Sequence, residues 1–220
     1  MLIDTLARTV PYSREAYFSL FGQYNDAIWP AQIAACLFFL LIPWAAAFPM
    51  HVTGRVIAAI LGAAWLWNGI AFHLMFFSRL NWAAWIFACL FIVQALLFFV
   101  TGTLRDRIAF RLRRDAAAWA GLFFIAYAIV MYPLVAEPVW PQLPLAGVAP
   151  CPTALATFGA LLLIEGRTPW RLIAIPALWS LFEGTNALVL GIPQDYVLPA
   201  AALISVLLVA RKNRLSASAA

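Results

Sequence analysis

Several ionisable and polar side chains stand inside apolar segments of this chain, and Glu183 is the strongest candidate for chemistry among them. It is the only acidic residue well inside such a segment. Helical spacing places Trp179 four residues before it and Asn186 three residues after it, on one helix face. A carboxyl in this setting is typical of a proton carrier or a cation ligand. It is equally typical of a protonated group that hydrogen-bonds to a neighbouring helix.

His73 and Cys151 are the candidate metal ligands. His73 is the only histidine inside an apolar segment, where it suits a proton relay, a ligand of an outward pocket, or a structural bond to a carbonyl. Cys151 stands between Pro150 and Pro152 at a predicted helix start, and a helix N-terminus favours the thiolate that binds soft metals. Such a thiolate also suits nucleophilic chemistry, and the alternative to both is a cysteine that only packs.

Asp195, Tyr132 and Asn68 complete the candidate ligand-binding or proton-relay residues. Asp195 precedes the last apolar segment, where capping a helix is its simplest role. Counting positions along the predicted helices puts six polar residues in the outer half of the membrane: His73, Tyr132, Cys151, Glu183, Asn186 and Asp195. We therefore expect a polar pocket that opens outward.

Membrane-spanning helices must position these side chains. Hydrophobic residues make up 65% of the 220 residues and charged residues only 10%, with a mean hydropathy of +0.92. Soluble domains carry about 45–50% apolar and about 25% charged residues. A helix needs roughly 20 apolar residues to cross a bilayer. The candidate spans are Ile28–Phe48, Val56–Phe77, Trp82–Gly102, Ala116–Ala136, Pro152–Ile164, Leu172–Leu190 and Tyr196–Ala210. The sequence thus predicts an all-α, polytopic integral membrane bundle of about seven transmembrane helices.

Basic residues predict the orientation of the bundle. With the C-terminus in the cytoplasm, 11 arginine and lysine side chains fall inside and 3 fall outside. Residues 1–27 are expected to form an external tail with an interfacial amphipathic helix that Ser13 caps; the alternative is a lid over the outer pocket. Residues 28–210 form the seven-helix domain, and residues 211–220 are predicted to be a disordered cytoplasmic tail.

Several function classes find no support in the sequence. It has no phosphate-binding glycine loop, no zinc-ligand spacing, and too few histidines in its spans for bis-histidine haem ligation. The basic run Arg105–Arg114 lies directly beside a span, which is typical of topology and anionic-lipid contact rather than nucleic-acid binding. The expected partners are the bilayer and a small-molecule or lipid ligand, and the oligomeric state stays open.

Short strings along the chain resemble a known bacterial family, DUF6064, a domain of unknown function. The strings are Gln23-Tyr24-Asn25, Trp29-Pro30-Ala31-Gln32, Trp65-Leu66-Trp67-Asn68-Gly69, Phe72-His73-Leu74, Tyr127-Ala128, Tyr132-Pro133-Leu134, Pro150-Cys151-Pro152-Thr153, Phe158-Gly159, Ile175-Pro176 with Trp179, and Gln194-Asp195. The resemblance covers nearly the whole chain. It implies a multi-span protein of the bacterial inner membrane, and it brings no assigned activity.

The resemblance also ranks the candidate residues. His73, Cys151 and Asp195 fall on positions of the family pattern. That pattern usually has a Gly-His pair in the loop before Cys151, where this chain has no histidine. Near Glu183 the pattern is usually small and apolar, which suggests that this carboxyl is peculiar to the present chain.

Three hypotheses of function follow. The first is transport or binding of a small solute or ion in the outward-facing pocket. The second is a membrane-embedded enzyme for a lipid or isoprenoid-like substrate, with Glu183 and Asp195 as an acid pair beside His73. The third is an accessory subunit of a membrane complex. The sequence favours the first and leaves open whether the protein is an enzyme.

Overall fold

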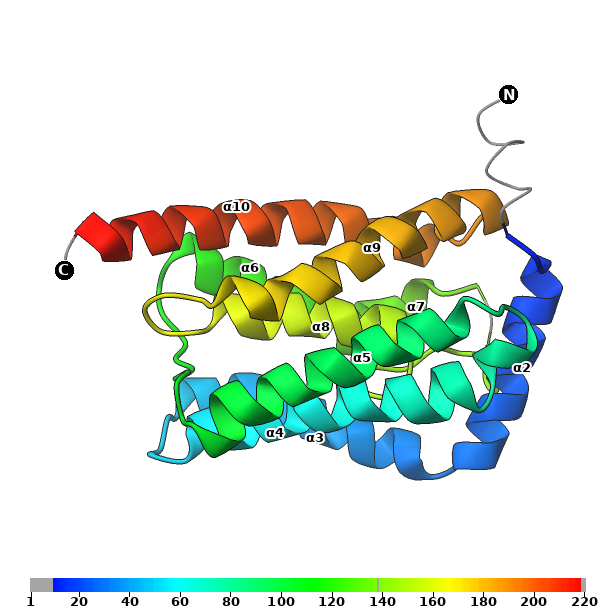
Figure 1. Cartoon of the computed structure of the whole chain (residues 1–220), viewed down its shortest axis with the longest axis horizontal. Coiled ribbons are helices and arrows are strands. Elements are labelled where there is room, and N and C mark those ends of the chain that lie inside the picture. The colour runs from blue at the N-terminus through cyan, green and yellow to red at the C-terminus, as the bar shows by residue number, and fades with distance from the viewer. Residues whose placement is uncertain (1–9, 138, 219–220) are drawn as a thin grey trace.

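The structure is a computed structural model that describes residues 10–137 and 139–218 as an all-α bundle, in which the long helices other than α2 run roughly along one axis (Figure 1). The helices are α2 (Arg14–Ile28), α3 (Ala31–Ala47), α4 (Thr53–Trp67), α5 (Ala84–Phe98), α6 (Ala116–Ala126), α7 (Tyr132–Val135), α8 (Pro150–Leu162), α9 (Trp170–Leu190) and α10 (Val197–Ser218). Three π-helical segments extend α4, α5 and α6: η1 (Asn68–Leu74), η3 (Phe99–Leu104) and η4 (Tyr127–Met131). Short 3₁₀ turns, η2 (Phe77–Arg79) and η5 (Pro193–Asp195), complete the chain.

Five helices of the described chain are long and apolar enough to cross a membrane: Thr53–Arg79, Ala84–Leu104, Ala116–Val135, Trp170–Leu190 and Pro193–Ala217. A sixth span results if α2 and α3, which meet at a bend of 90°, count as one. The prediction of seven spans counted α8 as well, but this apolar helix has only 13 residues. Large apolar side chains such as Leu37, Leu181 and Leu207 point away from the bundle. The protein is therefore a multi-pass membrane protein whose outer surface suits lipid.

Helix α2 lies across one end of the bundle (Figure 1), which we call the α2 end. The predicted helix and its cap are confirmed, since the Ser13 hydroxyl accepts a hydrogen bond from the Ala16 N–H at 3.2 Å. Its apolar face was expected to rest on the outer leaflet, but Tyr17, Phe21 and Tyr24 are buried against the bundle instead. Amphipathic periodicity gives the direction of an apolar face without saying whether lipid or protein covers it.

Helix α8 is the centre of the fold. All 13 of its residues are buried, and it packs against α4, α6, α9 and α10. Its small residues let neighbouring backbones come close. Where α8 crosses α6, Gly159 faces Gly121, and a Cβ atom added to Gly159 would lie 2.5 Å from the Gly121 carbonyl oxygen. A short helix thus becomes the core because other helices shield it from lipid.

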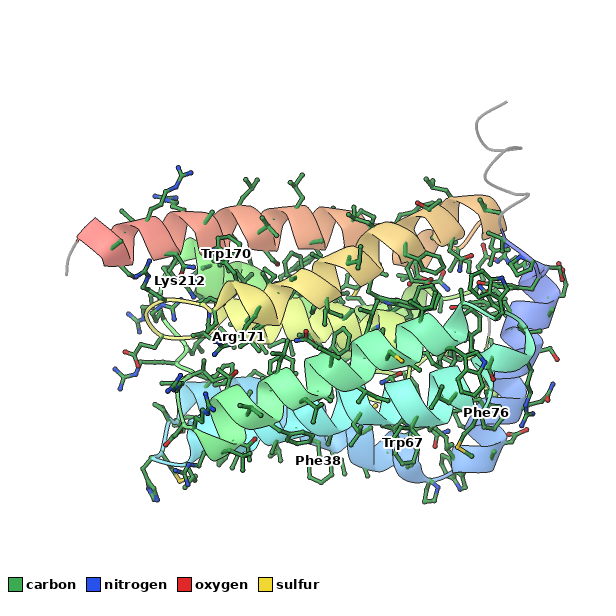
Figure 2. The ribbon with its side chains drawn as sticks, viewed as in Figure 1. Phe38, Trp67, Phe76, Trp170, Arg171 and Lys212 are labelled. Atoms are coloured by element: carbon green, nitrogen blue, oxygen red, sulfur yellow. The ribbon has the colours of Figure 1, made fainter. Side chains whose placement is uncertain are left out.

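The opposite end of the bundle gathers residues 105–115, residues 163–169 and the last turns of α10, and we call it the arginine end (Figure 1). Figure 2 shows the side chains of Arg171 and Lys212 in this region. A short backbone pairing joins Phe110 to Ile164, and Arg55 forms an ion pair with Asp106 at 3.3 Å. The segments that were predicted to face the cytoplasm therefore lie together in space.

Helix α10 continues to Ser218, so residues 211–218 are helical where the sequence predicted a disordered tail. Two contacts of these last turns explain the difference. The Lys212 ammonium donates to the Ile164 carbonyl at 3.0 Å, and the Asn213 side chain exchanges hydrogen bonds with the backbone of Thr168. Polar composition alone did not predict these partners.

Replacing Arg113 with glutamine is expected to lower the free energy of unfolding by about 1.5–3 kcal/mol, the usual contribution of hydrogen bonds to a charged group. Its guanidinium donates to the carbonyl of Leu162, the last residue of α8, and to the carbonyls of Leu163 and Ile164 just beyond it, at 2.9–3.3 Å. Without it the Leu162 carbonyl at the helix end loses this partner, whereas Leu163 and Ile164 keep their bonds from the Arg111 N–H and from Lys212. Thermal unfolding in detergent measures the effect, with the exposed Arg107→Gln as control; equal melting of both variants would contradict the assignment.

Candidate functional site

A thiol and two carboxyl groups meet inside the protein at the α2 end. Cys151, Glu183 and Asp195 each offer a ligand atom, all three atoms lie within 4.8 Å of one another, and all three residues are buried. We call them the thiol–carboxylate cluster. They come from α8, α9 and η5, which are separate in the sequence.

The start of α8 aims Cys151 at this cluster. Ala149 is the N-cap, so Pro150, Cys151 and Pro152 form the first turn. Prolines suit this turn because its N–H groups have no partner within the helix. The Cys151 N–H is therefore the only backbone donor among these three residues. The Cys151 thiol donates to Glu183 Oε2 at 3.6 Å.

Helix α9 contributes Glu183 together with Asn186. The Asn186 amide donates to Glu183 Oε2 at 3.4 Å, as the three-residue spacing predicted. Tyr12, just before α2, donates its hydroxyl to Asn186 Oδ1 at 3.2 Å. Burial, followed by the charge of Glu183, raises the pKa of the Tyr12 phenol well above its ordinary value. The phenol therefore stays protonated and keeps this hydrogen bond at neutral pH.

Asp195 reaches the cluster through the tight turn between α9 and α10. Gly191 ends α9 at φ +65°, a left-handed conformation that glycine adopts without strain, and η5 follows directly. Asp195 accepts a hydrogen bond from the Tyr132 hydroxyl. Instead of the predicted capping of the last helix, the side chain thus joins the buried cluster.

The cluster holds two carboxyl groups and a thiol, with no basic side chain paired to them among the described residues. Among residues 10–137 and 139–218, no arginine, lysine or histidine forms an ion pair with Glu183 or Asp195. Gln194, the residue before Asp195, is also buried, and both polar atoms of its side chain are without a hydrogen-bond partner among the described residues. Two neighbouring buried carboxylates disfavour each other's ionisation, and a bound cation or proton removes that penalty.

A hollow of about 430 Å³ leads toward the cluster from the α2 end, and we call it the vestibule. Its lining consists of Val10, Pro11, Tyr12, Asn81, Trp82, Ala83, Phe182, Thr185 and Asn186. Asn186 is thus shared between the vestibule and the cluster, because its amide contacts Glu183. Of the six residues predicted to form a polar pocket, only Asn186 lines the vestibule, and Tyr12 and Asn186 lie between the vestibule and the buried Glu183.

His73 lies in a different environment from Cys151. It is part of η1, it is fully buried, and its ring is surrounded by Phe72, Phe77, Phe87, Phe91 and Trp179. The Trp179 ring centroid lies 5.2 Å away, and neither imidazole nitrogen has a hydrogen-bond partner among the described residues. The structure therefore groups Cys151 with two carboxylates, whereas the predicted metal pair joined Cys151 to His73.

The Asn68 side chain hydrogen-bonds to backbone carbonyl groups and is not a member of the thiol–carboxylate cluster. Its amide donates to the Ala64 carbonyl at 2.8 Å and to the Gly147 carbonyl at 3.2 Å. Thr153 accepts a hydrogen bond from the Gly147 N–H at 2.9 Å. These bonds fix the segment that leads into the first turn of α8, so Asn68 positions the chain before Cys151 without itself joining the cluster.

Comparison with known proteins gives a family and nothing more specific. The sequence model of the family of unknown function DUF6064 matches residues 14–220. The chain therefore belongs to this family, as the strings along its sequence indicated. No curated protein and no solved structure matches the chain.

Proposed function

We propose that this DUF6064 protein binds a small cation at the thiol–carboxylate cluster and takes it up from the side of the membrane that α2 covers. The observation that carries the proposal is the convergence of Cys151, Glu183 and Asp195, buried, within 4.8 Å and without a basic partner. Buried charges persist in proteins when they are paired or coordinate a metal. A cation supplies the missing charge.

The donor set favours a divalent cation with some affinity for sulfur, such as Zn²⁺ or Cd²⁺. Thiolate ligands select soft or borderline metals, and carboxylates add negative charge. A tetrahedral site with a metal–sulfur distance of about 2.3 Å and metal–oxygen distances of about 2.1 Å leaves its ligand atoms about 3.5 Å apart. Small side-chain rotations bring the three donors to that separation. A water molecule would complete the coordination, because the Asn186 amide oxygen already accepts a hydrogen bond from Tyr12.

The membrane and the orientation are part of the same proposal. The arginine-rich segments gather at the end opposite α2, and such segments stay in the cytoplasm of bacteria. We therefore place the α2 end outside the bacterial inner membrane, with the C-terminus inside. Seven crossings fit this orientation when α3 and α8 are included as short spans. The vestibule then opens to the exterior.

The enzyme hypothesis finds weaker support. An enzyme for a lipid substrate needs its acid groups at a pocket that opens sideways to the bilayer. One such pocket lies between α3 and α4, but Glu183, Asp195 and His73 are absent from its lining. Cation binding uses the groups that the fold has brought together.

Equilibrium dialysis of the purified protein against Cd²⁺ tests the proposal. We expect one tightly bound Cd²⁺ per chain and much weaker binding of Mg²⁺. Replacing Cys151 with serine should lower the Cd²⁺ affinity at least tenfold, about 1.4 kcal/mol, because the soft ligand is lost. Absence of stoichiometric binding by the wild-type protein would refute the site.

The matched control is Cys89→Ser, since Cys89 is an exposed cysteine of α5 outside the cluster. It should bind Cd²⁺ as the wild type does. Measuring Cd²⁺ uptake into proteoliposomes then distinguishes a transporter from a binding protein. Uptake of Cd²⁺ that Cys151→Ser abolishes identifies a transporter, whereas binding without uptake identifies a binding protein.

A further inference from the structure

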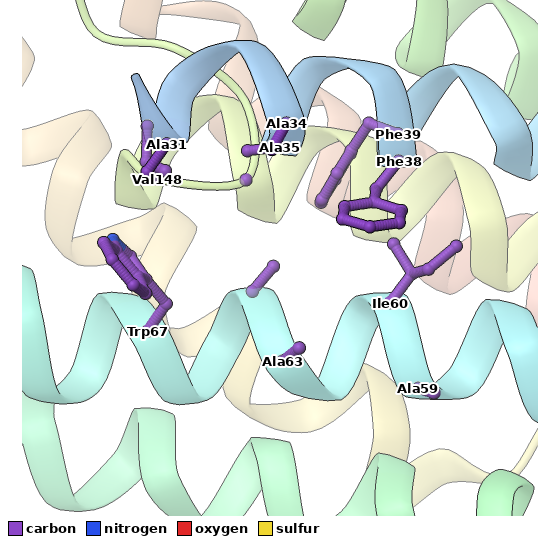
Figure 3. Close-up of a pocket in the computed structure, with 12 residues that line it drawn as sticks. Ala31, Ala34, Ala35, Phe38, Phe39, Ala59, Ile60, Ala63, Trp67 and Val148 are labelled. Atoms are coloured by element: carbon purple, nitrogen blue, oxygen red, sulfur yellow. The ribbon is translucent and has the colours of Figure 1, made fainter. Parts of the chain in front are cut away.

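A deep apolar slot runs between α3 and α4 on the outside of the bundle (Figure 3). Its volume is about 420 Å³. Alanines of both helices form its walls, among them Ala34, Ala35 and Ala63, and the backbone at Gly147 and Val148 closes its back. Phe38 and Trp67 stand at its two ends, as Figure 3 shows.

We propose that this slot binds one hydrocarbon chain of a membrane phospholipid. The slot is continuous with the surface that faces the bilayer. Its walls belong to apolar helices, and Leu37, Phe38 and Trp67 at or near its rim are 58%, 53% and 39% exposed. Alanine stripes usually bring membrane helices into close contact. Here the stripes face an open space, which in a bilayer fills with the surrounding hydrocarbon.

The dimensions of the slot distinguish a lipid chain from a protein partner. On α4 the lining runs from Ala59 to Trp67, a rise of about 12 Å along a helix. A dimer interface engages about 20–30 residues on each side, whereas 12 residues line the slot. A second copy of the chain therefore fits poorly.

The Trp67 end of the slot lies beside α2, which sets the direction of the bound chain. The Trp67 indole N–H donates to the Tyr24 hydroxyl at 2.8 Å, and that hydroxyl donates to the Val148 carbonyl at 2.7 Å. Tyr24 belongs to α2, so this end lies at the α2 end of the bundle. The lipid headgroup then lies beside α2, and the chain passes Ala63 toward Phe38.

Native mass spectrometry of the protein extracted from vesicles of phosphatidylethanolamine and phosphatidylglycerol tests the inference. We expect one phospholipid per chain to survive a delipidating detergent wash. Filling the slot by Ala63→Leu or Ala34→Leu should reduce this retained fraction at least fivefold. Both alanines are exposed, so the added atoms enter the slot without disturbing the core.

The control is Ala126→Leu, an equal change at an exposed position of α6 that is not part of the slot. It should retain lipid as the wild type does. Loss of lipid from all three variants, retention by both slot variants, or a dimer in place of the lipid adduct would overturn the inference. Cd²⁺ binding should be unchanged in the slot variants, so failure here leaves the proposed cation site standing.

Discussion

Valine in place of Gly159 is expected to lower the free energy of unfolding by about 3 kcal/mol or more, the upper range for overpacking a core. The Cβ atom would lie 2.5 Å from the Gly121 carbonyl oxygen and 2.6 Å from Ile125 Cγ1. A backbone oxygen cannot rotate away as the end of a side chain can, so α6 and α8 must separate. In a chain of this length the loss corresponds to a fall in melting temperature of about 6–12 °C.

Thermal unfolding of the detergent-solubilised protein measures this loss, and Gly22→Ala provides the control. A Cβ atom at Gly22 in α2 meets its nearest neighbour, a Gln142 side-chain carbon, at 3.5 Å, which is ordinary contact. This variant should melt at or slightly above the wild-type temperature, because alanine favours helix. If Gly159→Val and Gly22→Ala had the same melting temperature, α6 and α8 would not cross as closely as the structure shows.

The sequence indicated which residues lie toward the same end of their helices better than it indicated which of them are neighbours. Counting along helices placed Tyr132, Cys151, Glu183, Asn186 and Asp195 at one level, and the structure places these five in one hydrogen-bonded neighbourhood. His73 was counted at the same level. Depth follows from the number of residues between a side chain and the end of its helix, whereas neighbours depend on how helices are arranged around the bundle.

Tyr12 shows what this counting could not find. It belongs to the segment before α2, which is outside every predicted span, yet its hydroxyl contacts Asn186. The sequence does show that α2 has an apolar face, but the chemistry of that face is the same whether lipid or protein covers it. Only the 90° bend between α2 and α3 brings Tyr12 over the vestibule.

The sequence also did not indicate that α8 lies in the interior of the bundle. Its composition of alanine, leucine and threonine resembles that of a lipid-facing segment, and its 13 residues are too few for an ordinary span. Threonine side chains of α8 form hydrogen bonds with neighbouring helices. For example, the Trp65 indole of α4 donates to the Thr157 hydroxyl at 2.9 Å. The partner residue is 92 positions away in the chain, a separation over which periodicity carries no information.

Glu183→Gln is expected to raise the melting temperature of the cation-free protein at pH 8 and to abolish its response to Cd²⁺. Glutamine keeps the shape of the side chain but removes one of two neighbouring buried carboxylates, so the repulsion between them disappears. In the wild type, Cd²⁺ at a hundred times its dissociation constant should stabilise the fold by about 2.7 kcal/mol. That corresponds to about 5–10 °C.

Each protein is melted with and without Cd²⁺. Relative to the wild type, Glu183→Gln should melt at a higher temperature without Cd²⁺ and should show no increase when Cd²⁺ is added. Glu165→Gln is the matched control, since Glu165 is exposed at the arginine end, far from the cluster. Its Oε1 atom lies 3.9 Å from Arg111 Nη1. It should melt like the wild type and keep the full Cd²⁺ shift. A Cd²⁺ shift that persists in Glu183→Gln would place the cation elsewhere. A cation-free variant that melts below the wild type would show that Glu183 stabilises the bundle as a hydrogen-bonding group, because removing a carboxylate that is only repelled by its neighbour can only help the fold.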